Sequence, residues 1–289
     1  MTITPWYYDY YEKGTFPHQQ QLCDAVRWTK KYNLEGQKLK SPTVLSAIQG
    51  NPLTIRLLAL DEALKYFDNT KTIDKKIRKL AREHFDKKKL FMMSGTWKAE
   101  SSSLDTKGAP IEIIEIAGER LELRYIDIQL ALYGFFTNFG SVIDRLAYET
   151  DKFYELDIQR HCLDWGMLTS KPELDKLGAK NEVLAKLLSE HRNKFYNATR
   201  YRNRLIHDGI IHFEVEPGHI GIVIRLGENP DNDKSSFKVD AIRFCEDKKK
   251  EVLALLNESY KLMLQDFETM RRFLNDAGKN RGDWGDRAV

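Results

Sequence analysis

A long helical pattern runs from Tyr125 to about Leu156, and it limits the possible folds more than any other feature. Apolar side chains recur along it every three or four residues, which is the spacing of one helix face. These side chains are Ile128, Leu130, Leu132, Phe135, Phe136, Phe139, Val142, Ile143, Leu146 and Phe153. Asp144, Arg145 and Glu149 mark the polar face. Because a helix of this length must bury its apolar face against other helices, the pattern favours a helical bundle.

Further helical patterns lie on both sides of this segment. They cover a segment through Leu22, Val26 and Trp28, Pro52 to Phe67, the lysine-rich stretch to Phe85, a stretch ending at Met167, Asn181 to His207, and about Asp240 to Asp276. In the lysine-rich stretch, Ile73, Ile77, Leu80 and His84 fall on one stripe and are expected to face the core. The chain is therefore expected to be mostly α-helical.

Two short β-hairpins are expected among these helices. Ile111 to Ile116 pairs with Leu121 to Leu123 across Ala117-Gly118. Ile210 to Val215 pairs with Ile220 to Leu226 across Glu216-Pro217-Gly218-His219, as an insertion between two helices. Ser101 to Ser103 and Gly108 to Pro110 are expected to form a loop or linker. We therefore predict a helical N-terminal region over 1–100, a helical domain over 111–276 and a disordered tail over 277–289.

Composition excludes several classes of protein. The charged fraction is 31%, and no apolar run approaches the roughly 20 residues that cross a bilayer, so no membrane partner is expected. The first residues have no basic segment followed by an apolar one, as a secretion signal would. Cys23, Cys162 and Cys245 are widely separated, which favours buried, reduced thiols in a cytoplasmic protein without a zinc site. Motifs of phosphate-binding loops, dinucleotide folds, zinc proteases and serine hydrolases are absent from the sequence, so no cofactor is expected.

The last turns of the predicted helix Asn181 to His207 combine three kinds of polar group. Arg202 supplies a guanidinium, Asn203 an amide, and His207 an imidazole, and Gly209 follows where the helix is expected to end. A cation and an imidazole can together handle a phosphodiester, since one stabilises negative charge and the other transfers protons. On a straight helix, however, Arg202 lies about 140° from His207, whereas Arg200 and Asn203 share its face.

The Arg-Asn-x-x-x-His pattern of Arg202, Asn203 and His207 resembles that of the HEPN superfamily, over a helical block from about Tyr125 to Asp276. The resemblance implies a HEPN-like helical bundle and a metal-independent endoribonuclease that uses the ribose 2′-hydroxyl as nucleophile. It also implies a homodimer, since active relatives bring two motifs together and this chain has one. A role as a toxin or phage-defence effector, with a cognate antitoxin or regulatory protein, is a further implication. Some relatives carry a modifiable Tyr two residues after the His, but here that position is Gly209.

Two basic stretches are candidates for contact with RNA. Five Arg or Lys and no acidic residue lie between His191 and His207, and Arg192, Lys194, Arg200 and Arg204 are predicted to bind RNA there. The stretch from Lys71 to Lys89 holds nine basic and three acidic residues. Its lysines Lys75, Lys76, Lys79 and Lys87 are expected to be solvent-facing and less important for RNA.

Two other interpretations of the motif remain open. Arg202 could form a buried ion pair, with Asp144 or Glu149 as a partner, while His207 only stabilises the helix end. Alternatively, the chain could be a non-catalytic HEPN module that binds RNA, a nucleotide or a protein partner, or a dimerisation module. The discriminating feature is whether two His207 side chains of a dimer meet across a solvent-open cleft, since a buried His207 favours a structural role.

Overall fold

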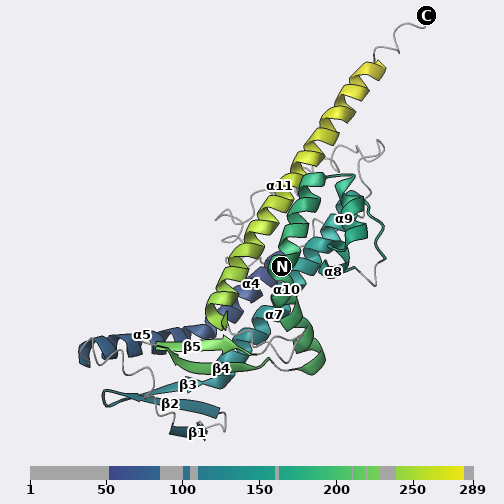
Figure 1. The fold of residues 1–289 in the computed structure, drawn as a ribbon. Coiled ribbons are helices and arrows are strands. Elements are labelled where there is room, and N and C mark those ends of the chain that lie inside the picture. The colour runs from purple at the N-terminus through teal and green to yellow at the C-terminus, as the bar shows by residue number, and fades with distance from the viewer. Residues whose placement is uncertain are drawn as a thin grey trace, which may run out of the picture. The chain divides into compact units, whose positions relative to one another are not determined.

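The structure is a computed structural model that describes residues 52–84, 100–104, 110–159, 163–209, 211–218, 221–227 and 239–282. Its described part is mostly helical, with two small antiparallel sheets of three strands each (Figure 1). The helices are α4 (Pro52–Lys65), α5 (Phe67–His84), α7 (Tyr125–Tyr154), α8 (Trp165–Leu168), α9 (Lys171–Gly178), α10 (Glu182–Asp208) and α11 (Ala241–Gly282). The predicted fold class is thus confirmed at the level of a mostly helical chain with small β elements.

The chain divides into two compact units. Among the described residues, the first unit comprises 52–54, 142–159, 163–195 and 250–282, and the second comprises 55–84, 100–104, 110–141, 196–209, 211–218, 221–227 and 239–249. Helices α7, α10 and α11 each contribute residues to both units. Helix α5, which falls in the N-terminal region predicted over 1–100, belongs to the second unit together with Arg202, Asn203 and His207.

The first unit is built on aromatic and aliphatic side chains that are almost fully buried. They include Phe153, Leu184, Leu188, Phe195, Val252, Leu256, Tyr260 and Phe267. Asn181 begins α10 because its Oδ1 accepts a hydrogen bond from the Leu184 N–H at 2.8 Å. Its Nδ2 donates to Asp266 Oδ2 at 2.8 Å, and the Tyr154 hydroxyl donates to the same oxygen at 2.7 Å. The start of α10 is thereby tied to α7 and α11.

The second unit contains both sheets. Strands β1 (Glu100–Leu104), β2 (Pro110–Ile116) and β3 (Glu119–Arg124) form one sheet in that order. Strands β4 (Phe213–Gly218), β5 (Gly221–Leu226) and β6 (Val239–Asp240) form the other. Both predicted hairpins are confirmed, and the turn of the first has the positive φ angles of Ala117 (52°) and Gly118 (81°) that a tight two-residue turn needs. The predicted turn of the second hairpin is wrong, because Glu216, Pro217 and Gly218 lie in β4 and pair with β5.

Helix α5 lies against strands of both sheets (Figure 1). Asp74 Oδ1 accepts a hydrogen bond from the Ile222 N–H at 2.7 Å, and Asp74 Oδ2 accepts from Arg78 Nε at 2.7 Å. Lys76 pairs with Glu119 of β3 at 2.5 Å. The side of α5 that bears Ile73, Ile77 and Leu80 is buried, as the stripe predicted. Polar contacts of α5 thus hold the second hairpin in place, and with it the segment that follows the motif.

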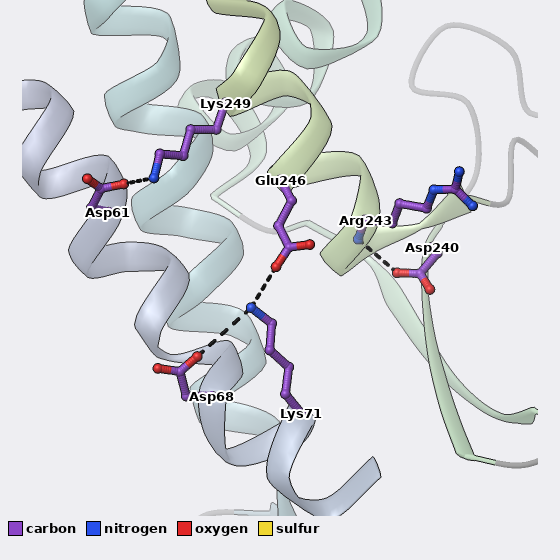
Figure 2. Close-up of polar contacts among 7 residues, drawn as sticks. All are labelled: Asp61, Asp68, Lys71, Asp240, Arg243, Glu246 and Lys249. Atoms are coloured by element: carbon purple, nitrogen blue, oxygen red, sulfur yellow. Dashed lines mark hydrogen bonds and ion pairs between the residues drawn. The ribbon is translucent and has the colours of Figure 1, made fainter. Parts of the chain in front are cut away.

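The start of α11 is joined to α4 and α5 by ion pairs, which Figure 2 shows. Lys71 Nζ lies 2.7 Å from Glu246 Oε1, and Lys249 pairs with Asp61. Asp240, the last residue of β6, accepts a hydrogen bond from the Arg243 N–H at 3.0 Å and so caps the helix. These contacts fix the position at which the chain passes from β6 into α11.

Several local predictions are wrong. Ser101 to Ser103 lie in β1, not in a loop, because Glu100 and Ser103, on either side of a register shift, pair with Ile113 and Ile111 of β2. The second helical stretch, expected to run to Met167, is helical only in α8 among the described residues: α7 ends at Tyr154, and Glu155 and Asp157 then take positive φ angles of 51° and 58°. Helix α9 was not predicted at all. In addition, His84 is exposed although it was placed on the buried stripe of α5.

Other predictions fall partly or wholly outside the described residues. This holds for the helix through Leu22, Val26 and Trp28. At the other end, α11 continues to Gly282, beyond the expected start of the tail at 277. Cys245 is buried with a free thiol, as expected, and burial raises the pKa of that thiol. No described helix is long and apolar enough to cross a membrane.

Candidate functional site

The motif occupies the last two turns of α10, in the second unit. Tyr201 and Leu205 anchor these turns because both are 3% exposed and belong to the core. The Tyr201 ring packs on Phe136 and Phe244, with centroids 5.2 and 6.2 Å apart. The helix ends at Gly209, whose φ is +74° and whose N–H donates to the Leu205 carbonyl at 3.0 Å. Because the side of α10 that bears Tyr201 and Leu205 is buried, the opposite side of the helix faces solvent.

The exposed side of α10 carries the imidazole and the amide of the motif. Tyr196, Arg200, Asn203 and His207 are all exposed. Their spacing of four, three and four residues keeps them within about 60° on an α-helix. The Arg200 guanidinium stacks over the Tyr196 ring at 5.5 Å. The arrangement offers an aromatic ring, a cation, an amide and an imidazole along one accessible face.

Arg202 lies on a different side of the same helix. Its aliphatic part packs on Gly140 of α7, where an added Cβ would come within 2.9 Å of Arg202 Cγ and Nε. Its Nη1 donates to Asn203 Oδ1 at 3.1 Å. Arg202 is half-buried, whereas His207 is exposed. Within one copy, the guanidinium of Arg202 therefore contacts the amide of Asn203 and is turned away from the imidazole by the helix geometry.

The acidic partner expected for Arg202 has other contacts. Glu149 is fully buried, although the sequence placed it on the polar face of α7. Its Oε1 accepts from Arg145 Nε at 2.8 Å and its Oε2 from the Tyr260 hydroxyl at 2.5 Å. Burial raises the pKa of Glu149 to about 7, against the opposing effects of Arg145 and Tyr260. Asp144 accepts a hydrogen bond from the Trp165 N–H. The ion pair that Glu149 forms is therefore with Arg145.

A pocket of about 390 Å³ opens beside the motif, and the sequence did not reveal it. It is lined by Tyr201, Arg204, Ile211, His212, Phe213, Glu214 and Gly227. The Gly227 N–H donates to the His212 carbonyl at 2.8 Å, and the Tyr201 hydroxyl donates to the Gly227 carbonyl at 3.3 Å. These contacts join the end of β5 to the segment between α10 and β4. Only Arg204 among the lining residues was a predicted site residue.

The predicted RNA-binding residues are divided between the two units. Arg192 and Lys194 are exposed in the first unit, where Arg192 Nη1 also donates to the Thr169 carbonyl at 2.7 Å. Arg200 and Arg204 lie in the second unit beside the motif, and Arg204 Nε contacts Asp208 Oδ2 at 3.2 Å. Arg200 and Arg204 are the two predicted cations that the second unit places next to His207 in the helix.

The lysine-rich helix α5 is exposed at Lys75, Lys76 and Lys79, as predicted, while Lys87 lies outside the described residues. Several of its cations have acidic partners. Lys71 pairs with Glu246, Lys76 with Glu119, and Arg78 with Asp74. The paired charges reduce the positive field of α5, so α10 remains the stronger candidate for contact with phosphate.

The remaining described histidines have different surroundings. His191 is largely buried, its Nδ1 lies 2.9 Å from the Leu187 carbonyl oxygen, and burial lowers its pKa. It packs edge-on against Phe195, which indicates a structural role. His212 lines the pocket. Among the described residues, no group of three or more His, Cys, Asp or Glu side chains is placed to hold a metal ion.

Comparison of the chain with protein-family models, with curated proteins and with solved structures found no match.

Proposed function

We propose that this chain is a metal-independent endoribonuclease that cleaves RNA at the surface formed by the end of α10. The observation that supports the proposal most directly is the exposed face bearing Arg200, Asn203 and His207, next to Arg202. An imidazole open to solvent is available for proton transfer, and guanidinium groups can stabilise the charge of a pentacoordinate phosphate.

In the proposed reaction, His207 removes the proton from a ribose 2′-hydroxyl. The 2′ oxygen forms a bond to the adjacent phosphorus while the bond from phosphorus to the 5′ oxygen breaks, and that oxygen takes up a proton. The products are a 2′,3′-cyclic phosphate and a 5′-hydroxyl. Asn203 orients Arg202 through their hydrogen bond.

The position of Arg202 favours a site shared by two copies. Because Arg202 and His207 lie about 140° apart on one helix, a single phosphate cannot easily meet both from the same copy. We therefore propose a homodimer in which Arg202 of one copy binds the phosphate on which His207 of the other copy acts. Ile206, which lies between these positions and is 58% exposed, gives the helix an apolar side chain for such an interface.

The test is cleavage of a fluorogenic RNA by the purified chain in the presence of EDTA. His207→Ala and Arg202→Ala should each lower the rate by about 10²- to 10⁴-fold, the usual range for loss of an acid–base group. Asn203→Ala should have a smaller effect. His84→Ala is the matched control, since His84 is also exposed and lies on another helix. A 2′-deoxy substitution at the cleaved position should block the reaction.

Mixing the two inactive variants tests the shared site. If Arg202 and His207 act across a dimer, a mixed dimer of Arg202→Ala and His207→Ala regains one complete site and activity returns. Light scattering reports the oligomeric state. Undiminished cleavage by His207→Ala would refute the catalytic assignment, and a strictly monomeric active protein would refute the shared site. RNA binding without cleavage would favour the non-catalytic module.

A further inference from the structure

We infer that the pocket beside the motif binds a guanine base, and that it positions the nucleotide next to the cleaved phosphate. This inference rests on the proposed RNA cleavage for its role, but the pocket itself is argued from its own residues. Its volume of about 390 Å³ lies near the lower end of the range for small-molecule sites and suits a single nucleotide.

The walls of the pocket suit a flat ring. Phe213, Tyr201 and Ile211 line it. Tyr201 and Ile211 are each 3% exposed and close its inner side, so the half-buried Phe213 is the aromatic ring that a base can reach. The Phe213 ring is fixed by stacking on Tyr125, with centroids 5.7 Å apart and an interplanar angle of 27°. Tyr201 is held by the hydrogen bond from its hydroxyl to the Gly227 carbonyl. Aromatic side chains that are already ordered bind a nucleobase at little cost in conformational entropy.

The charged residues of the pocket indicate which base it accepts. Glu214 provides a carboxylate with two acceptor oxygens, and Arg204 provides donors. Guanine is the one standard RNA base with two adjacent N–H donors, N1–H and the N2 amino group, on its Watson–Crick edge. It also carries the O6 and N7 acceptors that Arg recognises. Carboxylate and guanidinium together therefore favour guanine over adenine, cytosine and uracil.

The location of Arg204 connects the pocket with the motif. Arg204 precedes His207 by three residues, so their Cβ atoms are neighbours about 5 to 6 Å apart on the helix. Arg204 is held by its contact with Asp208 Oδ2 at 3.2 Å. A base in the pocket would thus bring its own ribose and phosphate toward His207, which makes guanosine the expected nucleotide at the cleavage position.

The inference is tested by calorimetric binding of four nucleoside monophosphates to the full chain, with inosine monophosphate as a fifth probe. Inosine lacks only the N2 amino group of guanosine. The guanosine nucleotide should bind at least about tenfold more tightly than the other four, since a good bidentate contact discriminates by that order. Glu214→Gln should remove the difference in affinity between the guanosine and inosine nucleotides. Glu122→Gln, at an exposed strand position of the other sheet, should leave the difference unchanged.

The outcomes separate the pocket from the proposed reaction. Equal binding of all five nucleotides, or an unchanged guanosine-to-inosine ratio in correctly folded Glu214→Gln, would overturn the guanine site even if RNA is cleaved. Selective guanosine binding without RNA cleavage would support the pocket and refute the proposed nuclease. Cleavage sites mapped on a mixed-sequence RNA should fall at guanosines in the wild type, and this bias should weaken in Glu214→Gln.

Discussion

The buried carboxyl group of Glu149 should make the protein less stable as the pH rises. Glu149 is fully buried, and burial raises its pKa from 4.5 to about 7. Between these two pH values the folded protein keeps the proton while the unfolded chain releases it. Stability therefore falls with increasing pH through this window and levels off above the folded-state pKa. The difference between the two pKa values corresponds to about 3 kcal/mol in the free energy of unfolding.

The substitution Glu149→Gln isolates this effect. Glutamine keeps an oxygen that can accept the Tyr260 hydroxyl, and it cannot ionise. We expect the stability of the variant, relative to wild type, to increase by about 3 kcal/mol between pH 4.5 and pH 8. Urea denaturation followed by circular dichroism measures both proteins at each pH, and the comparison cancels the contributions of all other titrating groups.

The attraction between the Arg145 guanidinium and the Glu149 carboxylate lowers the pKa of Glu149 and so opposes the effect of burial. Arg145 Nε lies 2.8 Å from Glu149 Oε1, and the Arg145 side chain is 19% exposed. If that attraction exceeds the desolvation of the carboxylate, the relative stability of Glu149→Gln will decrease with pH. A relative stability that decreases with pH, or that does not change with pH, would refute the claim that burial raises the pKa of Glu149. Glu258→Gln is the control, since Glu258 lies on α11 with a 48% exposed side chain and should show no such pH dependence.

Gly221→Ala and Asn181→Ala test contacts within the second and the first unit, and Gly118→Ala is the control for the first of these substitutions. Gly221→Ala should lower the free energy of unfolding by at least about 2 kcal/mol, because its φ is +130° and the new Cβ would lie 2.0 Å from Asp74 Oδ1. Gly118→Ala, with a φ of +81° and open space around it, should cost only about 1 kcal/mol, and equal losses would refute the steric argument. Asn181→Ala should cost about 1 to 2 kcal/mol in a urea titration, since it removes the cap of α10 and the contact to Asp266, and an unchanged midpoint would contradict this.

Long periodic helices were predictable from the sequence because their apolar spacing is local information. The bounds expected for the segments at Tyr125, Asn181 and Asp240 agree closely with the starts of α7, α10 and α11. Gly209 and the turn at Ala117-Gly118 were predictable for a similar reason, as positive φ angles select particular residues. The start of α9 was also readable, since Ser170 occupies the N-cap position and Pro172 follows in the first turn.

Elements that depend on distant partners were not predictable. Ser101 to Ser103 have a loop-like composition, and they form a strand only because β2 pairs with them. A second helical stretch was expected to end at Met167, but Asp151 Oδ1 accepts the Ile158 N–H at 3.0 Å and stabilises a turn at the beginning of that stretch. Leu130 fits the apolar stripe of α7, yet it is 42% exposed. For β1, pairing with another strand overrules the local pattern.

In the candidate site, too, some side-chain positions follow from local helix geometry and others depend on residues distant in the sequence. Helix geometry alone places His207 with Arg200 and Asn203 and turns Arg202 away. What the sequence could not supply is the surface that receives Arg202. Gly140 lies 62 residues before it, and only the missing Cβ at that position allows the guanidinium-bearing side chain to lie against α7. Arg202 is thus positioned by α7 as well as by its own helix, which is the kind of rigid support that a phosphate-binding cation in an active site requires.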